Sequence, residues 1–257
     1  MTISINDPVL KLESISMSYG TKNVLADISI ALHQGEVVCI LGESGVGKTT
    51  LFNVIAGLVK PDKGLVSLHG NNITGSAGHV SYMLQKDLLL PYKTVVDNAA
   101  LPLRIRGMDK AKSRHEARAY FSTFGLEGTE MLYPSQLSGG MRQRVAFLRT
   151  FLFSDDVALL DEPFSALDTI TKHQMQTWYL EIMSQLKLST FFITHDIDEA
   201  ILLSDRIYIL SGKPGKITYE LTIDAPKPRD DNFMLSDAFM TYKRTLKEHL
   251  NETKSTQ

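Results

Sequence analysis

The sequence contains a single cysteine among its 257 residues, so no disulfide can form within the chain. No apolar run approaches the roughly 20 residues that a helix needs to cross a bilayer, and no secretory signal pattern opens the sequence. Lysine and arginine (27) nearly balance aspartate and glutamate (29), which gives a formal net charge of −2 at pH 7. The composition therefore argues against a membrane-spanning chain and against a general affinity for nucleic acid.

The one cysteine, Cys39, lies inside the apolar run Val37–Leu41, where we expect it to be a small buried core residue. This use of cysteine fits a reducing cytosol. A chain of 257 residues can bury a substantial core, and one domain with an inserted lobe is expected. No internal repeat is visible in the sequence.

A glycine-rich loop follows the same apolar run. Residues Gly42–Thr49 read Gly-Glu-Ser-Gly-Val-Gly-Lys-Thr and meet the spacing G-x-x-x-x-G-K-[ST]. The run before the loop is typical of a buried parallel strand, and the apolar residues after it recur at helical spacing up to Gly57 and Pro61. The residues of this expected apolar helix face are Leu51, Val54, Ile55 and Leu58. A strand, a glycine loop and a helix are the context in which this motif binds phosphate groups.

The side chains of the loop indicate a nucleotide with its magnesium ion. The glycines let backbone N–H groups surround phosphate oxygens, and the helix N-terminus adds unpaired N–H groups and a positive dipole end. Because a cation at a helix N-terminus is unfavourable, Lys48 makes most sense beside an anion, and the Thr49 hydroxyl is placed to ligate Mg²⁺. The alternative is a flexible turn that ends in Lys-Thr by chance. The residues predicted to bind the nucleotide here are Gly42, Glu43, Ser44, Gly45, Val46, Gly47, Lys48, Thr49 and Thr50.

Two acidic residues follow a second apolar run. Val157–Leu160 is followed by Asp161 and Glu162, and acidic residues at the carboxyl end of a buried strand lie where ligands bind in open parallel sheets. We expect Asp161 to support Mg²⁺ through water and Glu162 to polarise the water that attacks the γ-phosphate. Taken alone, the pair is equally well an exposed turn before Pro163.

Two more strand-like runs are followed by polar residues. Thr190–Thr194 precedes His195, which we expect to reach the γ-phosphate side of the same site, although a lone histidine is more often structural. Val80–Leu84 precedes Gln85, which is placed to supply an oxygen to Mg²⁺ or to the attacking water. Taken singly, Gln85 means little.

A second glycine loop precedes the helical stretch Met141–Phe153. Ser138 is a good candidate for the N-cap, and Gly139 and Gly140 expose backbone N–H groups at the start of the helix. This arrangement builds a second anion-binding surface. The alternative is an ordinary capped helix after a Gly-Gly loop.

These motifs, in this order, resemble those of the nucleotide-binding subunit of an ATP-binding cassette transporter, from about Leu10 to about Ile223. The resemblance implies that Tyr19 stacks on adenine. Met141 stands where the family most often has glutamine, and the phosphate contacts of its motif are expected from Ser138 and the glycine backbone. The matching motifs are Walker A at Gly42–Thr49, the glutamine loop at Gln85, the signature motif at Leu137–Met141, Walker B at Val157–Glu162, the D-loop at Ser165–Asp168 and the switch histidine at His195.

The resemblance further implies an ATPase that works in pairs. Two copies form a head-to-tail dimer around ATP, in which the Walker A loop of one copy faces the signature loop of the other. Hydrolysis through the catalytic residues Glu162 and His195 releases the pair, with Thr49, Gln85 and Asp161 at Mg²⁺. Closing and opening of the dimer drive integral membrane permease subunits. An extracytoplasmic solute-binding protein is an indirect partner. The chain is thus expected on the cytoplasmic, inner face of the cell membrane, without nucleic acid.

The fold class implied is α/β: a P-loop NTPase core with a mostly parallel sheet flanked by helices, an N-terminal antiparallel β region and an inserted helical lobe. Within the lobe, Thr94–Gly107 and Asp109–Gly125 are predicted helices. The expected parts are the first, β-rich part of the nucleotide-binding core at 1–85, the helical lobe with the signature motif at 86–154, the second part of the core at 155–224 and a C-terminal extension at 225–257.

Two surface segments of the lobe are candidates for partner contacts. Asp87–Val96 contains Leu-Leu-Leu-Pro-Tyr, apolar residues predicted to be partly exposed beside Gln85. In the family, the coupling helix of the channel subunit docks near here; packing within the lobe is the alternative. The basic stretch between Arg104 and Arg118 is expected to be a solvated helix face, with contact to lipid head groups as a secondary alternative.

The C-terminal extension divides into an arm and a helix. Pro226–Arg229 reads Pro-Lys-Pro-Arg and predicts a linker or extended arm. A helix packed back on its own domain is expected next, although a regulatory or partner contact is an alternative, and the last few residues are expected to be frayed. The apolar residues of this helix are Leu235, Phe239, Tyr242 and Leu246.

Several stretches resemble the importers of the nitrate, sulfonate and taurine group, which also includes carriers of thiamine-precursor pyrimidines. The solute is bound by other subunits, so these residues do not name it.

An efflux or lipoprotein-release ATPase is the alternative, and the tail after Ile217 argues against it. A soluble ATPase of DNA repair or translation is a third alternative. Proteins of that class usually carry two cassettes, a long coiled-coil insertion or a basic surface. The stretches that resemble the nitrate, sulfonate and taurine importers are Leu90–Tyr92, Gly139–Arg144, His195–Ala200, Lys213–Ile217 and Pro226–Arg229.

Overall fold

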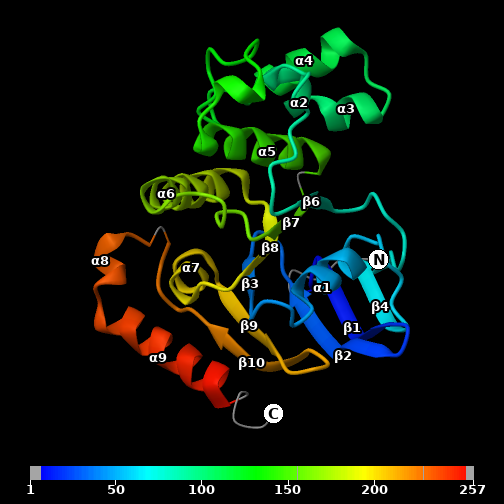
Figure 1. The fold of residues 1–257 in the computed structure, drawn as a ribbon, viewed down its shortest axis with the longest axis vertical. Helices are drawn as coiled ribbons and strands as arrows, with labels where there is room; N and C mark the ends of the chain where they lie inside the picture. Colours follow the sequence, from blue (N-terminus) through cyan, green and yellow to red (C-terminus); the bar gives the residue numbers. More distant parts are fainter. Residues whose placement is uncertain (1–6, 155, 228, 253–257) are drawn as a thin grey trace.

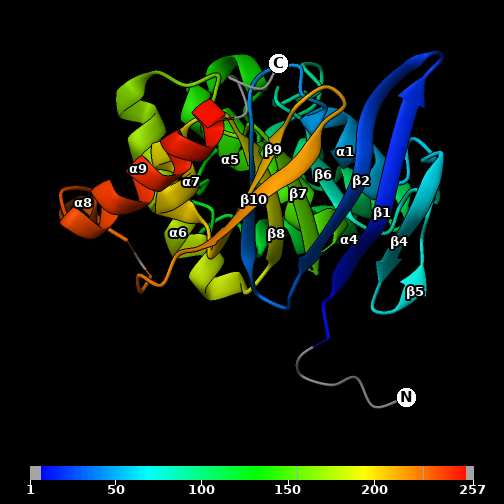
Figure 2. The ribbon, with the colours of Figure 1, turned by 90° about the horizontal axis from the view of Figure 1, so that it is seen from below.

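The computed structural model describes residues 7–154, 156–227 and 229–252. The expected boundary at residue 155, Pro228 of the predicted arm and the end of the chain predicted to be frayed lie outside these ranges. Two β-sheets lie in the lower part of the molecule in Figure 1, and the green helical segment lies above them. Figure 2, seen from below, shows the blue N-terminal strands beside the strands of the central sheet.

The central sheet holds six strands. They are β3 (Val37–Leu41), β6 (Ser81–Met83), β7 (Val157–Asp161), β8 (Ser189–Thr194), β9 (Arg206–Ser211) and β10 (Lys216–Thr222). Their order across the sheet is β10-β9-β3-β8-β7-β6. The neighbours from β9 to β6 pair in parallel, and β10 runs antiparallel to β9 at the edge. The expected mostly parallel sheet is confirmed.

Both faces of this sheet are buried, as is usual for parallel strands. Cys39 and Leu41 of β3 face one apolar cluster, whereas Val38 and Ile40 face another on the opposite side, because successive side chains of a strand alternate. Burial raises the pKa of the Cys39 thiol well above its ordinary value. The prediction that Cys39 is a small buried core residue is confirmed.

The N-terminal antiparallel region is also confirmed. It holds β1 (Leu10–Tyr19), β2 (Lys22–Leu32), β4 (Lys63–Leu68) and β5 (Asn71–Asn72). Their order is β2-β1-β4-β5, with antiparallel neighbours. Its buried residues share one apolar cluster with the glycine-loop helix and with one face of the central sheet.

The core helices are α1 (Lys48–Ile55), α6 (Thr169–Leu186) and α7 (Ile197–Leu203). Helix α1 buries Leu51, Val54 and Ile55, as their helical spacing predicts. The expectation for Leu58 is wrong, since this side chain is 60% exposed. The helix ends at Ile55, and Gly57 turns the chain at a φ of +71°, where an added Cβ would lie 2.2 Å from the Ser76 carbonyl oxygen.

The helical lobe contains shorter helices than the sequence predicts. Thr94 caps the first helix, but the expected helix Thr94–Gly107 is divided because Pro102 has no N–H to donate and its ring conflicts with the preceding turn. The expected helix Asp109–Gly125 stops at Arg118, after which the N–H groups of Tyr120 and Phe121 bond to carbonyls three residues back, as in a 3₁₀ turn. The elements of the lobe are α2 (Val95–Ala99), α3 (Leu101–Ile105), α4 (Lys110–Arg118), a 3₁₀ turn (Pro134–Gln136) and α5 (Gly139–Phe153).

The C-terminal extension forms α8 (Asp231–Met234) and α9 (Asp237–Glu252), which run along the edge of the molecule in Figure 1. Phe239 and Leu246 of α9 are buried, so the predicted helix packed on its own domain is present. Leu235 was expected on that apolar face, but it lies between the two helices and is 86% exposed. Among the described residues, no helix combines the length and the apolarity needed to cross a membrane.

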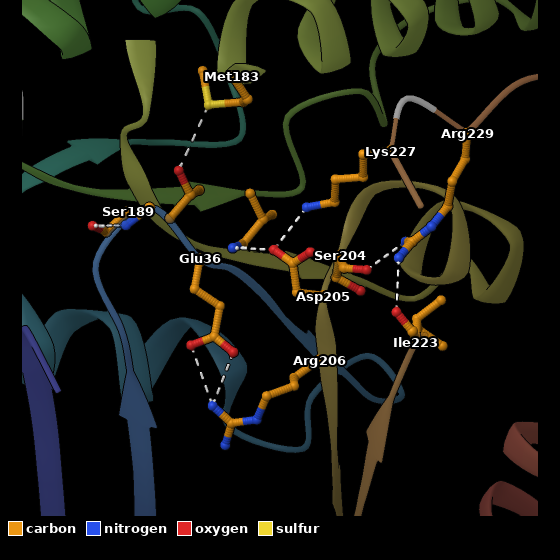
Figure 3. Close-up of polar contacts among 12 residues, drawn as sticks. Glu36, Met183, Ser189, Ser204, Asp205, Arg206, Ile223, Lys227 and Arg229 are labelled. Atoms are coloured by element: carbon orange, nitrogen blue, oxygen red, sulfur yellow. Dashed lines mark hydrogen bonds and ion pairs between the residues drawn. The ribbon is translucent and has the colours of Figure 1, made fainter. Parts of the chain in front are cut away.

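The predicted extended arm is instead anchored in the core at its last residue. Arg229 is 3% exposed, and its guanidinium donates hydrogen bonds to the carbonyl oxygens of Ile201, Ser204 and Ile223. Figure 3 shows Arg229 beside Lys227, whose ammonium lies 2.7 Å from an Asp205 carboxylate oxygen. A side chain that satisfies several buried carbonyls fixes the direction in which the C-terminal helices leave the sheet.

We predict that Arg229→Met lowers the free energy of unfolding by about 2–3 kcal/mol, because it leaves buried carbonyl oxygens without donors. The matched change Lys227→Met removes a half-exposed ion pair and should cost no more than about 1 kcal/mol. Urea unfolding followed by circular dichroism measures both. Equal losses for the two variants would contradict the anchoring role of Arg229.

Candidate functional site

The parallel pairing of the central strands brings the predicted site residues to one edge of the sheet. Strands β3, β8, β7 and β6 are consecutive neighbours that run in the same direction. Their carboxyl ends lead directly into the glycine loop at Gly42, into His195, into Glu162 and, shortly after β6, into Gln85. Ligands of open parallel sheets bind at this edge.

The glycine loop has a shape that side chains would prevent at two positions. Gly47 is the N-cap of α1 and adopts a φ of 112°, where an added Cβ would lie 2.9 Å from a Leu25 methyl carbon. An added Cβ at Gly42 would lie 2.4 Å from the Leu210 carbonyl oxygen. The loop therefore stays close to the sheet, and its backbone leads into the N-terminus of α1, where N–H groups favour an anion.

Lys48 is a buried cation at the start of α1. It is 6% exposed, and its ammonium donates to the carbonyl oxygens of Gly42 and Glu43 at 2.8 and 2.9 Å. Burial lowers the pKa of Lys48, while the negative charges of Glu162 and Asp161 act in the opposite direction. The Glu162 carboxylate lies 4.0 Å away. A positive charge is thus held under the loop, next to the acidic residues of the neighbouring strands.

Thr49, in the first turn of α1, and Asp161, at the end of β7, form an oxygen-rich pair. The Thr49 hydroxyl donates to an Asp161 carboxylate oxygen at 3.1 Å, and the Tyr82 hydroxyl donates to the same oxygen at 3.4 Å. Burial raises the pKa of Asp161, and these hydrogen bonds oppose the shift. A hydroxyl and a carboxylate are ligands that Mg²⁺ prefers, usually together with phosphate oxygens and water. The pair therefore fits the predicted metal role of both residues.

Glu162 is the centre of the polar contacts at the sheet edge. One carboxylate oxygen lies 3.3 Å from His195 Nδ1, and the other accepts a hydrogen bond from the Gln85 side-chain amide at 3.2 Å. The Gln85 amide also donates to the Ser165 hydroxyl. Glu162 has a φ of 46°, an uncommon conformation for a residue with a side chain and one that clusters at functional sites. The residues that follow β6 and β8 thus direct two side chains toward the Glu162 carboxylate at the end of β7.

A pocket of about 440 Å³ lies over this edge. Predicted site residues contribute part of its wall, and the end of α9 contributes another part that the sequence did not predict. Tyr82 and Ser165 were likewise missed as contacts of Asp161 and Gln85; Ser165 stands in the D-loop match, which was the available signal. The lining residues are Leu41, Gly42, Glu43, Ser44, Glu162, His195, Ile197, Lys247, Leu250 and Asn251.

Other predicted residues lie away from the pocket wall. Tyr19 is exposed at the end of β1, and Thr50 lies in the first turn of α1. Ser138 caps α5, as predicted, by accepting a hydrogen bond from the Met141 N–H at 3.2 Å. In the part of the chain that the structure describes, none of these residues lines the pocket. The second glycine loop therefore does not contribute to the pocket of its own chain.

Comparison with known proteins identifies the family. The family model described as ABC transporter matches residues 25–165. The formylaminopyrimidine import ATP-binding protein of Halalkalibacterium halodurans is 44% identical over 207 residues, which cover 80% of this chain and 81% of that protein. The taurine import ATP-binding protein of Pseudomonas aeruginosa is 39% identical over 219 residues, with coverage of 84% and 83%.

A solved structure agrees with the sequence relatives. It is a dimeric ATP-binding cassette in a post-hydrolysis state with ADP and Pi, is 28% identical and superposes with a TM-score of 0.71 over 84% of this chain and 100% of its own. The predicted fold class and the predicted resemblance are confirmed. The chain therefore belongs to the ABC transporter family, as one of its ATPase cassettes, and resembles the cassettes of the nitrate, sulfonate and taurine import group.

Proposed function

We propose that the chain binds MgATP at the edge of the central sheet and hydrolyses it, as part of a homodimer, to drive import of a small solute through separate membrane subunits. The observation that carries the proposal is the meeting of Lys48, Asp161, Glu162 and His195 at the carboxyl ends of three neighbouring parallel strands. One buried cation, one metal-type carboxylate and one carboxylate beside a histidine are the groups that phosphoryl transfer to water requires.

The phosphates are proposed to lie on the glycine loop. Backbone N–H groups of Gly42–Thr50 surround them, and the ammonium of Lys48 exchanges its two carbonyl acceptors for phosphate oxygens. Mg²⁺, held by Thr49 and, through water, by Asp161, neutralises phosphate charge when it is bound. Gln85 is close enough to Glu162 to contact the same cluster. The adenine ring is proposed to stack on the exposed ring of Tyr19.

The chemical step is assigned to Glu162. Its carboxylate orients a water molecule and accepts a proton from it as the water attacks the γ-phosphate. His195, at 3.3 Å from this carboxylate, orients Glu162 and lies beside the phosphate that is being transferred. Gln85 holds the other carboxylate oxygen and so restricts its rotation. The fixed positions of these groups provide positioning and charge stabilisation, which dominate catalysis of phosphoryl transfer.

A second copy is proposed to complete the site. Among the described residues that line the pocket, none belongs to the signature residues Ser138, Gly139 and Gly140 of the same chain. These three residues nevertheless present a helix N-terminus suited to an anion. In a head-to-tail dimer, this loop reaches the ATP held by the partner. The solved relative with ADP and Pi is dimeric, which supports this arrangement.

A permease subunit is proposed to dock between the core and the helical lobe. An apolar pocket of about 280 Å³ lies there, lined by residues that include Leu58, Tyr82 and Ile105. Leu58 and Ile105 are exposed, and so are Leu88 and Tyr92 in the predicted docking segment. Exposed apolar residues around a pocket mark interaction sites. We therefore include the docking segment and this pocket in one surface, called the lobe groove.

The direction of transport follows from the relatives, which are named as import ATP-binding proteins for formylaminopyrimidine and taurine. We assign the solute to the same broad class of small polar organic molecules, delivered by an extracytoplasmic binding protein. The chain then works on the cytoplasmic face of the membrane, attached through its permease. Residues 86–154 act as the helical lobe between the two parts of the core at 1–85 and 155–224.

Lys48→Ala should weaken ATP binding about 10- to 100-fold, because it removes a charge-assisted contact to phosphate. Isothermal titration calorimetry measures the dissociation constant. The control Lys63→Ala removes an exposed lysine of β4 and should leave the constant unchanged. Undiminished ATP binding by Lys48→Ala would refute the assignment of the glycine loop.

Glu162→Gln should lower ATP turnover at least about 100-fold while preserving ATP binding, because the amide keeps the shape of the carboxylate but accepts no proton. ATP should consequently trap this variant as a dimer, which light scattering after size exclusion detects. An ATP-loaded variant that stays monomeric at high concentration would argue against the head-to-tail pair.

Ile105→Asp should abolish copurification with the permease, because it places a charge in the lobe groove. The ATPase activity of the purified chain should change less than about twofold, since Ile105 is exposed and does not line the pocket at the sheet edge. Leu235→Asp is the matched control, with an equally exposed apolar residue in the C-terminal extension. Retention of the permease by Ile105→Asp would exclude the lobe groove as the docking site.

A further inference from the structure

The last turn of α9 forms one wall of the pocket over the sheet edge. Lys247, Leu250 and Asn251 line it together with Ser44 of the glycine loop and with His195. These three residues belong to the C-terminal extension, outside the 25–165 segment matched by the family model. The motifs of the cassette give them no role.

The fold holds this turn of α9 in place. Phe239 and Leu246 are buried in the core, and the Lys243 ammonium lies 2.6 Å from an Asp198 carboxylate oxygen. Asp198 belongs to α7, the helix that follows His195. The His249 ring stacks on Tyr219 of β10 with ring centroids 3.7 Å apart. Contacts to α7 and to β10 therefore fix the end of α9 beside the site.

Lys247 lies on the face of α9 that is directed at α7. It follows Lys243 by one helical turn, and residues four apart share a face of a helix. Leu250 and Asn251 continue this face into the pocket. The Lys247 side chain is exposed and, among the residues that the structure describes, makes no ion pair or hydrogen bond. Its ammonium is thus available to a ligand in the pocket.

The pocket covers the terminal-phosphate side of the proposed nucleotide site. Glu162 and His195, which act on the transferred phosphate, line it, whereas Tyr19, assigned to adenine, does not. Glu43 and Glu162 bring negative charge to this wall, and the C-terminal end of α9 adds its partial negative charge. A triphosphate in this pocket therefore gains from a cation that reaches in from α9.

We propose that Lys247 binds the terminal phosphate of ATP, so that the C-terminal helix distinguishes ATP from ADP. The inference rests on the proposed function, because it assumes that the nucleotide lies on the glycine loop. Binding of ATP then attaches α9 to the site through its own ligand. The C-terminal extension is by this account a sensor of the γ-phosphate.

The test compares Lys247→Met with Arg244→Met, which removes an exposed cation from the same helix outside the pocket wall. Calorimetry at low ionic strength, on chain dilute enough to be monomeric, gives dissociation constants for MgATP and for MgADP. Lys247→Met should weaken ATP binding about fivefold and ADP binding less than about twofold, and the difference should shrink in high salt. Arg244→Met should change neither constant, and Lys247→Arg should restore ATP binding.

Equal effects of Lys247→Met on ATP and ADP would overturn the inference. Behaviour like that of Arg244→Met would do the same, and so would a defect confined to dimer formation. These outcomes leave the proposed function intact if the wild-type chain binds ATP and Lys48→Ala binds it more weakly. Failure of the wild-type chain to bind ATP would overturn the proposed function and, with it, the role of Lys247.

Discussion

The parallel register of β3, β8 and β7 is the constraint on which the rest of the site depends. Because these strands are neighbours that run the same way, residues from distant parts of the sequence arrive at one edge of the sheet. Contacts from Glu162 to Lys48 and His195 exist only because of that register. A slip by one residue would turn the alternating side chains of a strand to the opposite faces and separate these groups. The buried apolar residues on both faces of the sheet hold the register.

The price of this arrangement is the burial of charge. Lys48 and Asp161 are both buried. Burial lowers the pKa of Lys48 and raises the pKa of Asp161, and both shifts favour the neutral form of the group. Carbonyl oxygens satisfy Lys48, and the hydroxyls of Thr49 and Tyr82 satisfy Asp161. A nucleotide with its metal ion offers the opposite charges to both. The site is therefore organised for a charged ligand rather than for stability alone, since buried ionic groups contribute little net stability.

Sequence patterns predicted the core of the molecule well, because its strands are short apolar runs that end in glycine, acidic or histidine residues. The run Val37–Leu41 is a strand with the same bounds in the structure. Predictions were wrong where one residue outweighed a periodic pattern: Pro102 divided a helix, and Gly57 left Leu58 exposed. The buried anchoring of Arg229 and the wall formed by α9 were not predictable, because they depend on tertiary contacts between segments far apart in sequence. The assignment of Tyr19 to adenine stays a prediction.

We propose that one chain holds half of each ATP site, so that hydrolysis needs two chains. The most direct test is the specific ATPase activity of the purified chain as a function of its concentration, with mass photometry reporting the fraction of dimer. Activity per chain should rise with concentration and saturate as the dimer forms with ATP. Constant activity per chain, down to concentrations at which every molecule is a monomer, would contradict this proposal.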